Sequence, residues 1–150
     1  MIVALHQPHF CPWLGYFDRM RQADLFVLLD HVAHQPESYA SRVRVKSGDA
    51  SQWLSVPLEP SSRPEPIALK RLEAVAAGDP WPRRVLAALG AAYGAAPHFQ
   101  ETFEKLQGVL RAPEGRLVDL NRRLIELIKE ALDIRTPIIH SSALGVGGEN

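Results

Sequence analysis

Two histidines near the start of the chain have the type and spacing that point most directly to chemistry. They form the segment His6-Gln-Pro-His9, which follows an apolar run from Ile2 to Leu5. An imidazole exchanges protons near neutral pH, and a pair of them at a strand end can hydrogen-bond a phosphate and stabilise developing charge. The alternative is structural, with His6 ending a strand and His9 solvated in a loop.

A second pair of ionisable residues, Asp30 and His31, follows the next apolar run, Leu25 to Leu29. A carboxylate there can orient a histidine or hold Mg²⁺, or it can simply cap a turn. Ligands of parallel sheets bind at the carboxyl ends of the strands. We therefore predict His6, His9 and Asp30 as catalytic residues, with His31 binding substrate beside them.

Further substrate-binding candidates are basic, aromatic or amide side chains. Arg42 and Arg44 alternate along a predicted strand, and their guanidinium forks suit a phosphate or carboxylate; the alternative is a solvated strand face. The rest of the predicted binding set comes from the N-terminal segment: Gln7, Trp13 and Tyr16. Aromatic rings can stack on a base or a sugar, although in so apolar a region they can equally belong to the core. No zinc-like spacing of ligands is present, and Cys11 is better explained as buried filler than as a nucleophile.

The elements that must position these residues follow from hydrophobic periodicity. Two apolar runs joined by about 15 residues of helical pattern predict a βαβ unit with parallel strands. Residues 39–45 and 52–58 flank a turn and predict a β-hairpin, with Pro57 near an edge or a strand end. Apolar stripes predict three helices, the first capped by Asp79 with Pro80 as its first residue, the second from near Pro97, and the third over 117–133. A last strand is expected at 137–140, and a flexible end at 145–150.

Together these elements predict an α/β fold with a Rossmann-like βαβ start, a mostly parallel sheet, a β-hairpin insertion and three helices. The 150 residues suit a single domain, 1–150. Seventeen basic and seventeen acidic residues cancel, which disfavours nucleic acid as a partner. One cysteine and the lack of a long apolar run predict a cytoplasmic protein without a disulfide or a membrane span.

The opening unit resembles that of Rossmann-like nucleotidyltransferases, which place an H-x-x-H pair, usually H-x-G-H, between the first strand and a helix. Here the pair is followed by a helix that ends on Ala23-Asp24 and by a second apolar strand. Pro8 replaces the usual glycine, and no later phosphate loop rich in lysine or serine is recognisable. This resemblance implies that the histidines bind nucleotide phosphates.

A longer resemblance covers nearly the whole chain. The string HQPHFCPWLGYF, from His6 to Phe17, resembles the opening signature of the WbqC-like family. The strand ending on Asp30, the segment Arg42-Val-Arg44 and the strand Trp53-Leu-Ser-Val-Pro57 follow in the family's order. Ser41 stands where the family usually has asparagine, and members usually extend further at the C-terminus, so a domain shortened at that end is expected.

The family resemblance implies a setting more than a mechanism. WbqC-like genes occur in bacterial clusters for O-antigen and other surface polysaccharides, which implies a transferase, of nucleotidyl- or acyl-transfer type, acting on a nucleotide-linked or activated sugar. The resemblance leaves the cofactor open, with Mg²⁺ as the candidate if the substrate is a nucleotide. The alternatives are a non-catalytic ligand-binding domain and a protein-interaction module. An exposed edge strand or apolar patch would further predict self-association into a homo-oligomer.

Overall fold

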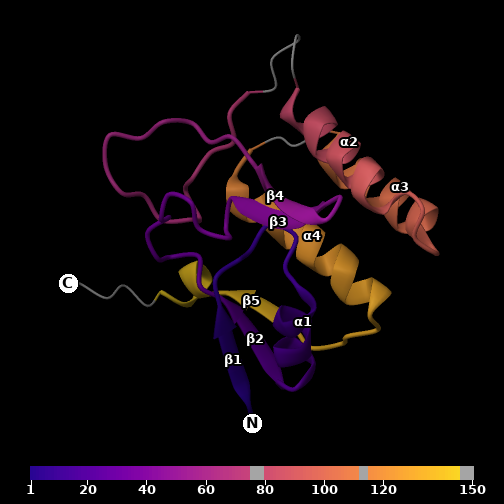
Figure 1. Cartoon of the computed structure of the whole chain (residues 1–150). Helices are drawn as coiled ribbons and strands as arrows, with labels where there is room; N and C mark the ends of the chain where they lie inside the picture. The colour runs from indigo at the N-terminus through magenta and orange to yellow at the C-terminus, as the bar shows by residue number, and fades with distance from the viewer. Residues whose placement is uncertain (75–79, 112–114, 146–150) are drawn as a thin grey trace.

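The computed structural model describes residues 1–74, 80–111 and 115–145 (Figure 1). Its first sheet has three parallel strands, β1 (Val3–His6), β2 (Leu25–Leu28) and β5 (Ile138–His140), in the order β1-β2-β5. Helix α1 (Leu14–Arg21) connects β1 to β2. The predicted βαβ unit and α/β class are therefore confirmed, and the last strand lies beside β2.

The register of this sheet decides which side chains share a face. His6 pairs with Leu28, and Leu28 pairs with His140, so these three side chains leave the same face of the sheet. Leu28 and Phe26 are fully buried on that face, in a cluster that includes side chains from α1 and α4. Both histidines thus lie at the carboxyl end of the sheet on its covered side.

The predicted hairpin is confirmed, and it forms a separate two-stranded antiparallel sheet. Its strands are β3 (Arg42–Ser47) and β4 (Ala50–Ser55), and the turn uses Gly48 with φ of 57°, a conformation that glycine adopts without strain. Pro57 lies beyond the end of β4, where its missing N–H costs no ladder bond.

Three further helices follow: α2 (Trp81–Tyr93), α3 (Phe99–Leu110) and α4 (Leu117–Ala131). Asp79 and residues 146–150 lie outside the described residues. Pro80 is the N-cap of α2 rather than its first helical residue, since its extended ψ of 115° precedes the helix. The predicted start of the second helix, near Pro97, is close to the observed one. A 3-10 turn over Ser141–Leu144 follows β5.

Helix α4 joins the two halves of the core. Its residues Leu120 and Leu124 pack in a cluster with the hairpin, α2 and Phe10, whereas Ile125 packs with the parallel sheet and α1. Figure 1 accordingly shows α4 running between the hairpin and the parallel sheet. An amphipathic helix with apolar residues on two sides is the expected solution where two layers must share one helix.

A buried amide on α4 fixes the loops that carry the candidate site. The side chain of Asn121 is fully buried, and its Nδ2 donates hydrogen bonds to the carbonyl oxygens of Pro8 (2.9 Å) and Ala40 (2.7 Å). The loop after β1 and the segment before β3 are therefore held to the same point, and the Phe10 N–H donates to Tyr39 O at 2.9 Å beside it.

Strand β1 forms an edge of the parallel sheet, and its outer face is open. Val3 and Leu5 are 38% and 53% exposed there. Self-association through this strand stays a prediction. Among the described residues, no helix combines the length and apolarity that a membrane crossing requires.

Candidate functional site

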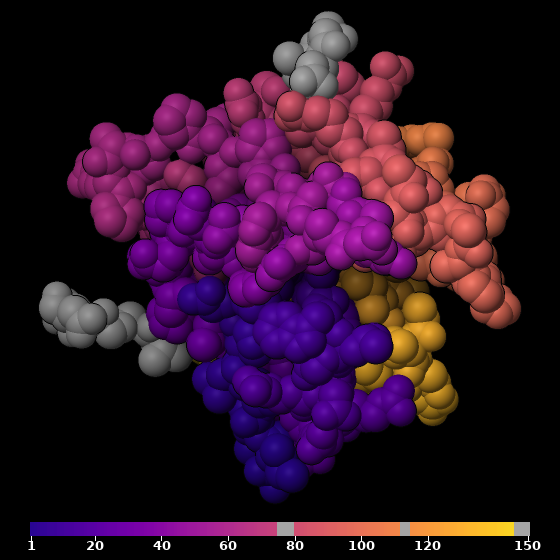
Figure 2. All heavy atoms as spheres, viewed as in Figure 1, coloured from indigo at the N-terminus to yellow at the C-terminus, as the bar shows by residue number. Residues whose placement is uncertain are grey.

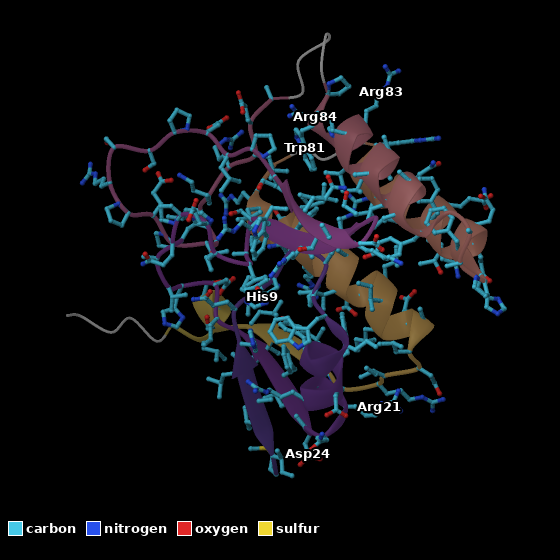
Figure 3. All side chains as sticks on the ribbon, viewed as in Figure 1. His9, Arg21, Asp24, Trp81, Arg83 and Arg84 are labelled. Carbon is cyan, nitrogen blue, oxygen red and sulfur yellow. The ribbon has the colours of Figure 1, made fainter. Side chains whose placement is uncertain are left out.

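The two histidines of the H-x-x-H segment lie against each other. The ring centroids of His6 and His9 are 4.5 Å apart with an edge-to-face orientation, and the Tyr16 ring lies 4.7 Å from that of His6. Figure 3 shows His9 between the parallel sheet and the hairpin. His9 is only 7% exposed, so the alternative of a solvated loop histidine is wrong.

Burial favours the neutral form of both imidazoles. Desolvation, assisted by the neighbouring His6, lowers the pKa of His9 to about 4. Burial also lowers the pKa of His6, against the effect of its contact with the Gln7 carbonyl. The Nδ1 atom of His9 is buried with no hydrogen-bond partner among the described residues. The pair therefore offers neutral hydrogen-bonding and proton-accepting groups, rather than fixed positive charge.

Three exposed aromatic rings extend from His9 across the surface, and we call Trp13, Tyr39 and Trp53 the aromatic strip. Tyr39 stacks on His9 with centroids 5.6 Å apart, and it lies 6.0 Å from Trp13 and 5.6 Å from Trp53. All three remain well exposed, at 54%, 45% and 42% in chain order. In Figure 2 the N-terminal segment and the hairpin segment meet on the visible surface. Exposed rings of this kind are suited to stacking on a sugar or a base.

A glycine sets the position of the first ring in the aromatic strip. A Cβ atom on Gly15 would lie 2.6 Å from Nε1 of Trp13, so only glycine lets the indole rest on the start of α1. This contact gives a structural reason for the Trp-Leu-Gly order in the N-terminal segment.

The two arginines lie on the hairpin face that carries Trp53. The guanidinium carbon of Arg42 is 4.2 Å from the Trp53 ring centroid, which is a cation–π contact, and Nη1 lies 3.6 Å from Glu37. Arg44 pairs across the ladder with Trp53, and its Nε donates to Ser51 Oγ at 2.6 Å. The predicted common face of Arg42 and Arg44 is therefore present, and it continues the aromatic strip.

A cavity of about 390 Å³ opens beside the aromatic strip, and we call it the hairpin cavity. Its walls come from the loop 9–13, Tyr39, residues 43–45 and Leu54 of the hairpin, and Val85, Leu89 and Tyr93 of α2. Cys11 is part of this wall, and burial raises the pKa of its thiol to about 12. A thiol so far from ionisation at neutral pH acts as packing, as predicted, and not as a nucleophile.

Asp30 belongs to a different cluster at the ends of β2 and β5. Its buried carboxylate accepts hydrogen bonds from His140 Nδ1 (2.8 Å), Ser141 Oγ (3.0 Å), and the backbone N–H (2.9 Å) and hydroxyl (2.8 Å) of Ser142. Burial alone would raise the pKa of Asp30, but these bonds, led by the Ser142 N–H, bring the pKa below its usual value. Both oxygens are thus in use within the protein.

The remaining predicted residue, His31, also belongs to this cluster. Its Nδ1 lies 2.6 Å from Ser141 Oγ. Ser141 gives its proton to Asp30 and accepts the Asp30 N–H at 3.1 Å, so the short contact requires Nδ1 of His31 to donate. The register puts the Cα atoms of His6 and His140 two strand spacings apart, roughly 9.5 Å. The structure therefore brings His6, His9, Trp13 and Tyr16 together, and gathers Asp30 and His31 in a neighbouring group.

Within residues 1–74, 80–111 and 115–145, no group of three or more His, Cys, Asp or Glu side chains is arranged to hold a metal ion. Four further residues shape the site but were not predicted as site residues: Tyr39, Trp53, Asn121 and His140. Trp53 could have been predicted from the sequence, because it is the first residue of the Trp-Leu-Ser-Val-Pro segment. The other three are brought to the site by contacts distant in sequence.

The fold and site define an α/β protein whose parallel strands end at a histidine-aromatic surface. The chain belongs to the WbqC-like protein family, whose profile matches residues 7–150. It is also similar to "Uncharacterized protein Rv1507c" of Mycobacterium tuberculosis (strain ATCC 25618 / H37Rv), with 32% identity over 140 residues, which cover 93% of this chain and 59% of that protein. The chain thus spans about three fifths of the length of this relative. No solved structure matches it.

Proposed function

We propose that this protein binds a nucleotide-linked or otherwise activated sugar and acts as a transferase in the synthesis of a surface polysaccharide such as O-antigen. The observation that carries the proposal is the aromatic strip, which connects the neutral His6-His9 pair at one end to the hairpin arginines at the other. Membership of the WbqC-like family supports a role in surface polysaccharide synthesis, since genes of this family occur in clusters for such polysaccharides.

The arrangement suits a ligand with a ring at one point and an anionic group at another. A sugar or base would stack on Trp13, Tyr39 or Trp53, while Arg42 and Arg44 would bind its phosphates. The ion pair of Arg42 with the exposed Glu37 is weak in water, so a phosphate can replace it at small cost.

The histidines would act as neutral groups in the transfer. The acceptor hydroxyl or amine attacks the activated group, its proton passes to an imidazole, and the nucleotide leaves with the electrons of the broken bond. His6 is the more accessible of the two histidines, and His9 is held beside it. An anionic ligand near the pair would raise the pKa values of both imidazoles, which favours this proton uptake.

Isothermal titration calorimetry with UDP-glucose and UTP tests the binding step. We expect Trp53→Ala and His9→Ala to weaken binding of both ligands about tenfold, while His98→Asn leaves it unchanged, because His98 is an exposed histidine outside the aromatic strip whose positive φ asparagine tolerates. No binding by the wild-type protein, or equal binding by all four proteins, would refute the proposal.

A non-catalytic ligand-binding protein is the second candidate, and the Asp30 cluster favours it. The carboxylate is enclosed by hydrogen bonds and lies apart from the histidine pair, so no carboxylate is seen to orient His6 or His9 within the described chain. Chromatography for UDP released from UDP-glucose in the presence of sugar and amine acceptors separates the two candidates. Release that needs His6 supports the transferase, whereas binding without release supports the second candidate.

A further inference from the structure

The inner wall of the hairpin cavity is mostly apolar, in contrast to the arginine-bearing face of the hairpin. Val43, Val45 and Leu54 of the hairpin face Val85 and Leu89 of α2, and these apolar side chains form most of its inner wall. Polar groups in the lining come from the exposed Arg44, the imidazole of His9, the hydroxyls of Tyr39 and Tyr93, and the indole N–H of Trp13. Small-molecule sites commonly have this distribution, with an apolar body and a few placed polar groups.

One of these polar groups is unsatisfied. His9 is more than nine-tenths buried, lines the cavity, and has its Nδ1 without a hydrogen-bond partner among the described residues. A buried polar atom left unpaired costs free energy. The cavity thus combines apolar walls with a buried histidine in its lining.

A second apolar cavity adjoins the first. This second cavity, of about 300 Å³, lies between α2 and α3, and its walls include Leu89, Tyr93, Phe99, Phe103 and Leu106. Leu89 and Tyr93 line both spaces. Mostly apolar walls suit an aliphatic group better than a nucleobase, whose polar edges would find few partners there.

Arg44 supplies charge at the rim of the hairpin cavity: it lines the cavity, but its side chain leaves β3 on the face that carries Trp53, opposite Val43 and Val45. Its Nε donates to Ser51 Oγ at 2.6 Å, which orients the guanidinium while leaving its other donors for a ligand. A carboxylate or phosphate at the end of an aliphatic chain would meet this group while the chain lies among the apolar walls.

We infer that the hairpin cavity binds an aliphatic acyl chain that carries an anionic group, with the chain between the hairpin and α2 and the anion at Arg44. The inference deepens the proposed function, on which it rests for the role of the site: the substrate or the transferred group would be acylated. A fatty acid and an acyl group attached to a phosphate-bearing carrier share this chemistry. The cavity alone therefore does not distinguish between them.

Calorimetric titration of the whole protein with carboxylates of increasing length, from butyrate to decanoate, tests the inference. Affinity is expected to rise roughly fourfold per methylene until the apolar space is filled. Leu89→Trp and, from the opposite wall, Val43→Phe should each weaken decanoate binding at least tenfold by filling the cavity. Ala87→Trp, on the exposed side of the same helix, is the matched control and should bind as the wild type does.

The charge at Arg44 is tested by comparing decanoate with 1-decanol. Arg44→Gln should weaken decanoate binding several-fold and leave 1-decanol unchanged, whereas Lys46→Gln, on the same strand but outside the hairpin cavity, should affect neither. Decanoyl phosphate serves as the phosphate-bearing probe, and tighter binding than decanoate would identify an acyl carrier as the source.

The outcomes separate the inference from the proposed function. Decanoate binding that both cavity-filling variants abolish supports the inference, even if UDP-glucose does not bind and the proposed function fails. Nucleotide binding with no carboxylate binding upholds the proposed function and overturns the inference. Decanoate binding that is equal in the wild type and both cavity-filling variants overturns it as well, since the chain would then lie elsewhere.

Discussion

The carboxylate of Asp30 accepts a 2.8 Å hydrogen bond from Nδ1 of His140, and this contact joins residues 110 positions apart in the chain. It connects the end of β2 to the end of β5 at the carboxyl edge of the parallel sheet. The ring of His140 is consequently fixed with Nδ1 toward the carboxylate, and its side chain remains 17% exposed. A buried carboxylate with four donors around it stabilises the fold only as long as it stays ionised.

Replacement of Asp30 by asparagine should therefore destabilise the protein. The amide NH₂ would face donors that now bond an oxygen, so we expect a loss of about 2–4 kcal/mol in the free energy of unfolding. Urea denaturation measures it. Asp133→Asn is the control, because Asp133 is highly exposed and has a positive φ that asparagine tolerates. Equal midpoints for Asp30→Asn and the control would show that the cluster contributes little.

Acidification should weaken the fold in two steps of the same sign. His9 has its pKa lowered to about 4, so the unfolded chain takes up a proton first, and stability falls as pH decreases from about 6.5 toward 4. The loss is on the order of 2 kcal/mol after allowance for solvent screening. Asp30, whose folded pKa lies below its usual value, adds a further loss as pH falls below about 4.

The variant His9→Phe isolates the first of these steps. Phenylalanine removes the titrating group and the unpaired Nδ1, so the variant should lose less stability than the wild type between pH 7 and 5. Its remaining loss comes from His6 and His34, whose pKa values burial also lowers. Thermal unfolding across this pH range provides the comparison. Parallel pH profiles for the two proteins would contradict the neutral, buried state of His9.

Loss of the Asn121 amide should destabilise the fold. Asn121→Leu leaves the carbonyl oxygens of Pro8 and Ala40 buried without their donor, so we expect a loss of about 2–4 kcal/mol in the free energy of unfolding. Denaturant unfolding measures the loss, with the exposed neighbour Arg122→Ala as control. An unchanged stability would mean that these loops are held by other contacts.

Gly15→Ala should weaken ligand binding without destabilising the protein. The new Cβ would displace the Trp13 indole, whose Nε1 lies 2.6 Å from its position, while alanine gains up to about 1 kcal/mol of helix propensity. We expect altered tryptophan fluorescence and weaker UDP-glucose binding in a protein at least as stable as the wild type. Gly90→Ala in α2, where the added Cβ meets nothing within 4 Å, should raise stability with binding unchanged.

The fold was largely predictable from the sequence because its elements carry strong local patterns. The two apolar runs before the H-x-x-H segment and before Asp30 gave β1 and β2, and the spacing of leucines over residues 117–132 gave α4. The observed strand and helix ends differ from the predicted ones by a few residues. Ladder hydrogen bonds and helix caps determine these ends, and a hydrophobic pattern does not contain them.

The site was less predictable because distant residues assemble it. The burial of His9 depends on Tyr39 stacking on it and on Asn121 holding the adjacent carbonyl, which no local pattern reveals. Asp30 was expected near His6 because both end parallel strands, but its side chain turns to His140 on the other flanking strand. His140 was not among the predicted site residues, because its bond to Asp30 joins strands that are far apart in the sequence.

The most direct test of the central claim is an NMR titration of protein labelled with ¹⁵N-histidine, using UDP-glucose at pH 7. The claim is that a neutral His6-His9 pair lies at the end of a sugar-binding aromatic strip. It predicts that both imidazoles have the ¹⁵N shifts of neutral rings before addition, and that their signals move with ligand while that of His98 stays in place. Charged imidazoles in the free protein, or His6 and His9 signals that do not respond to ligand, would contradict it.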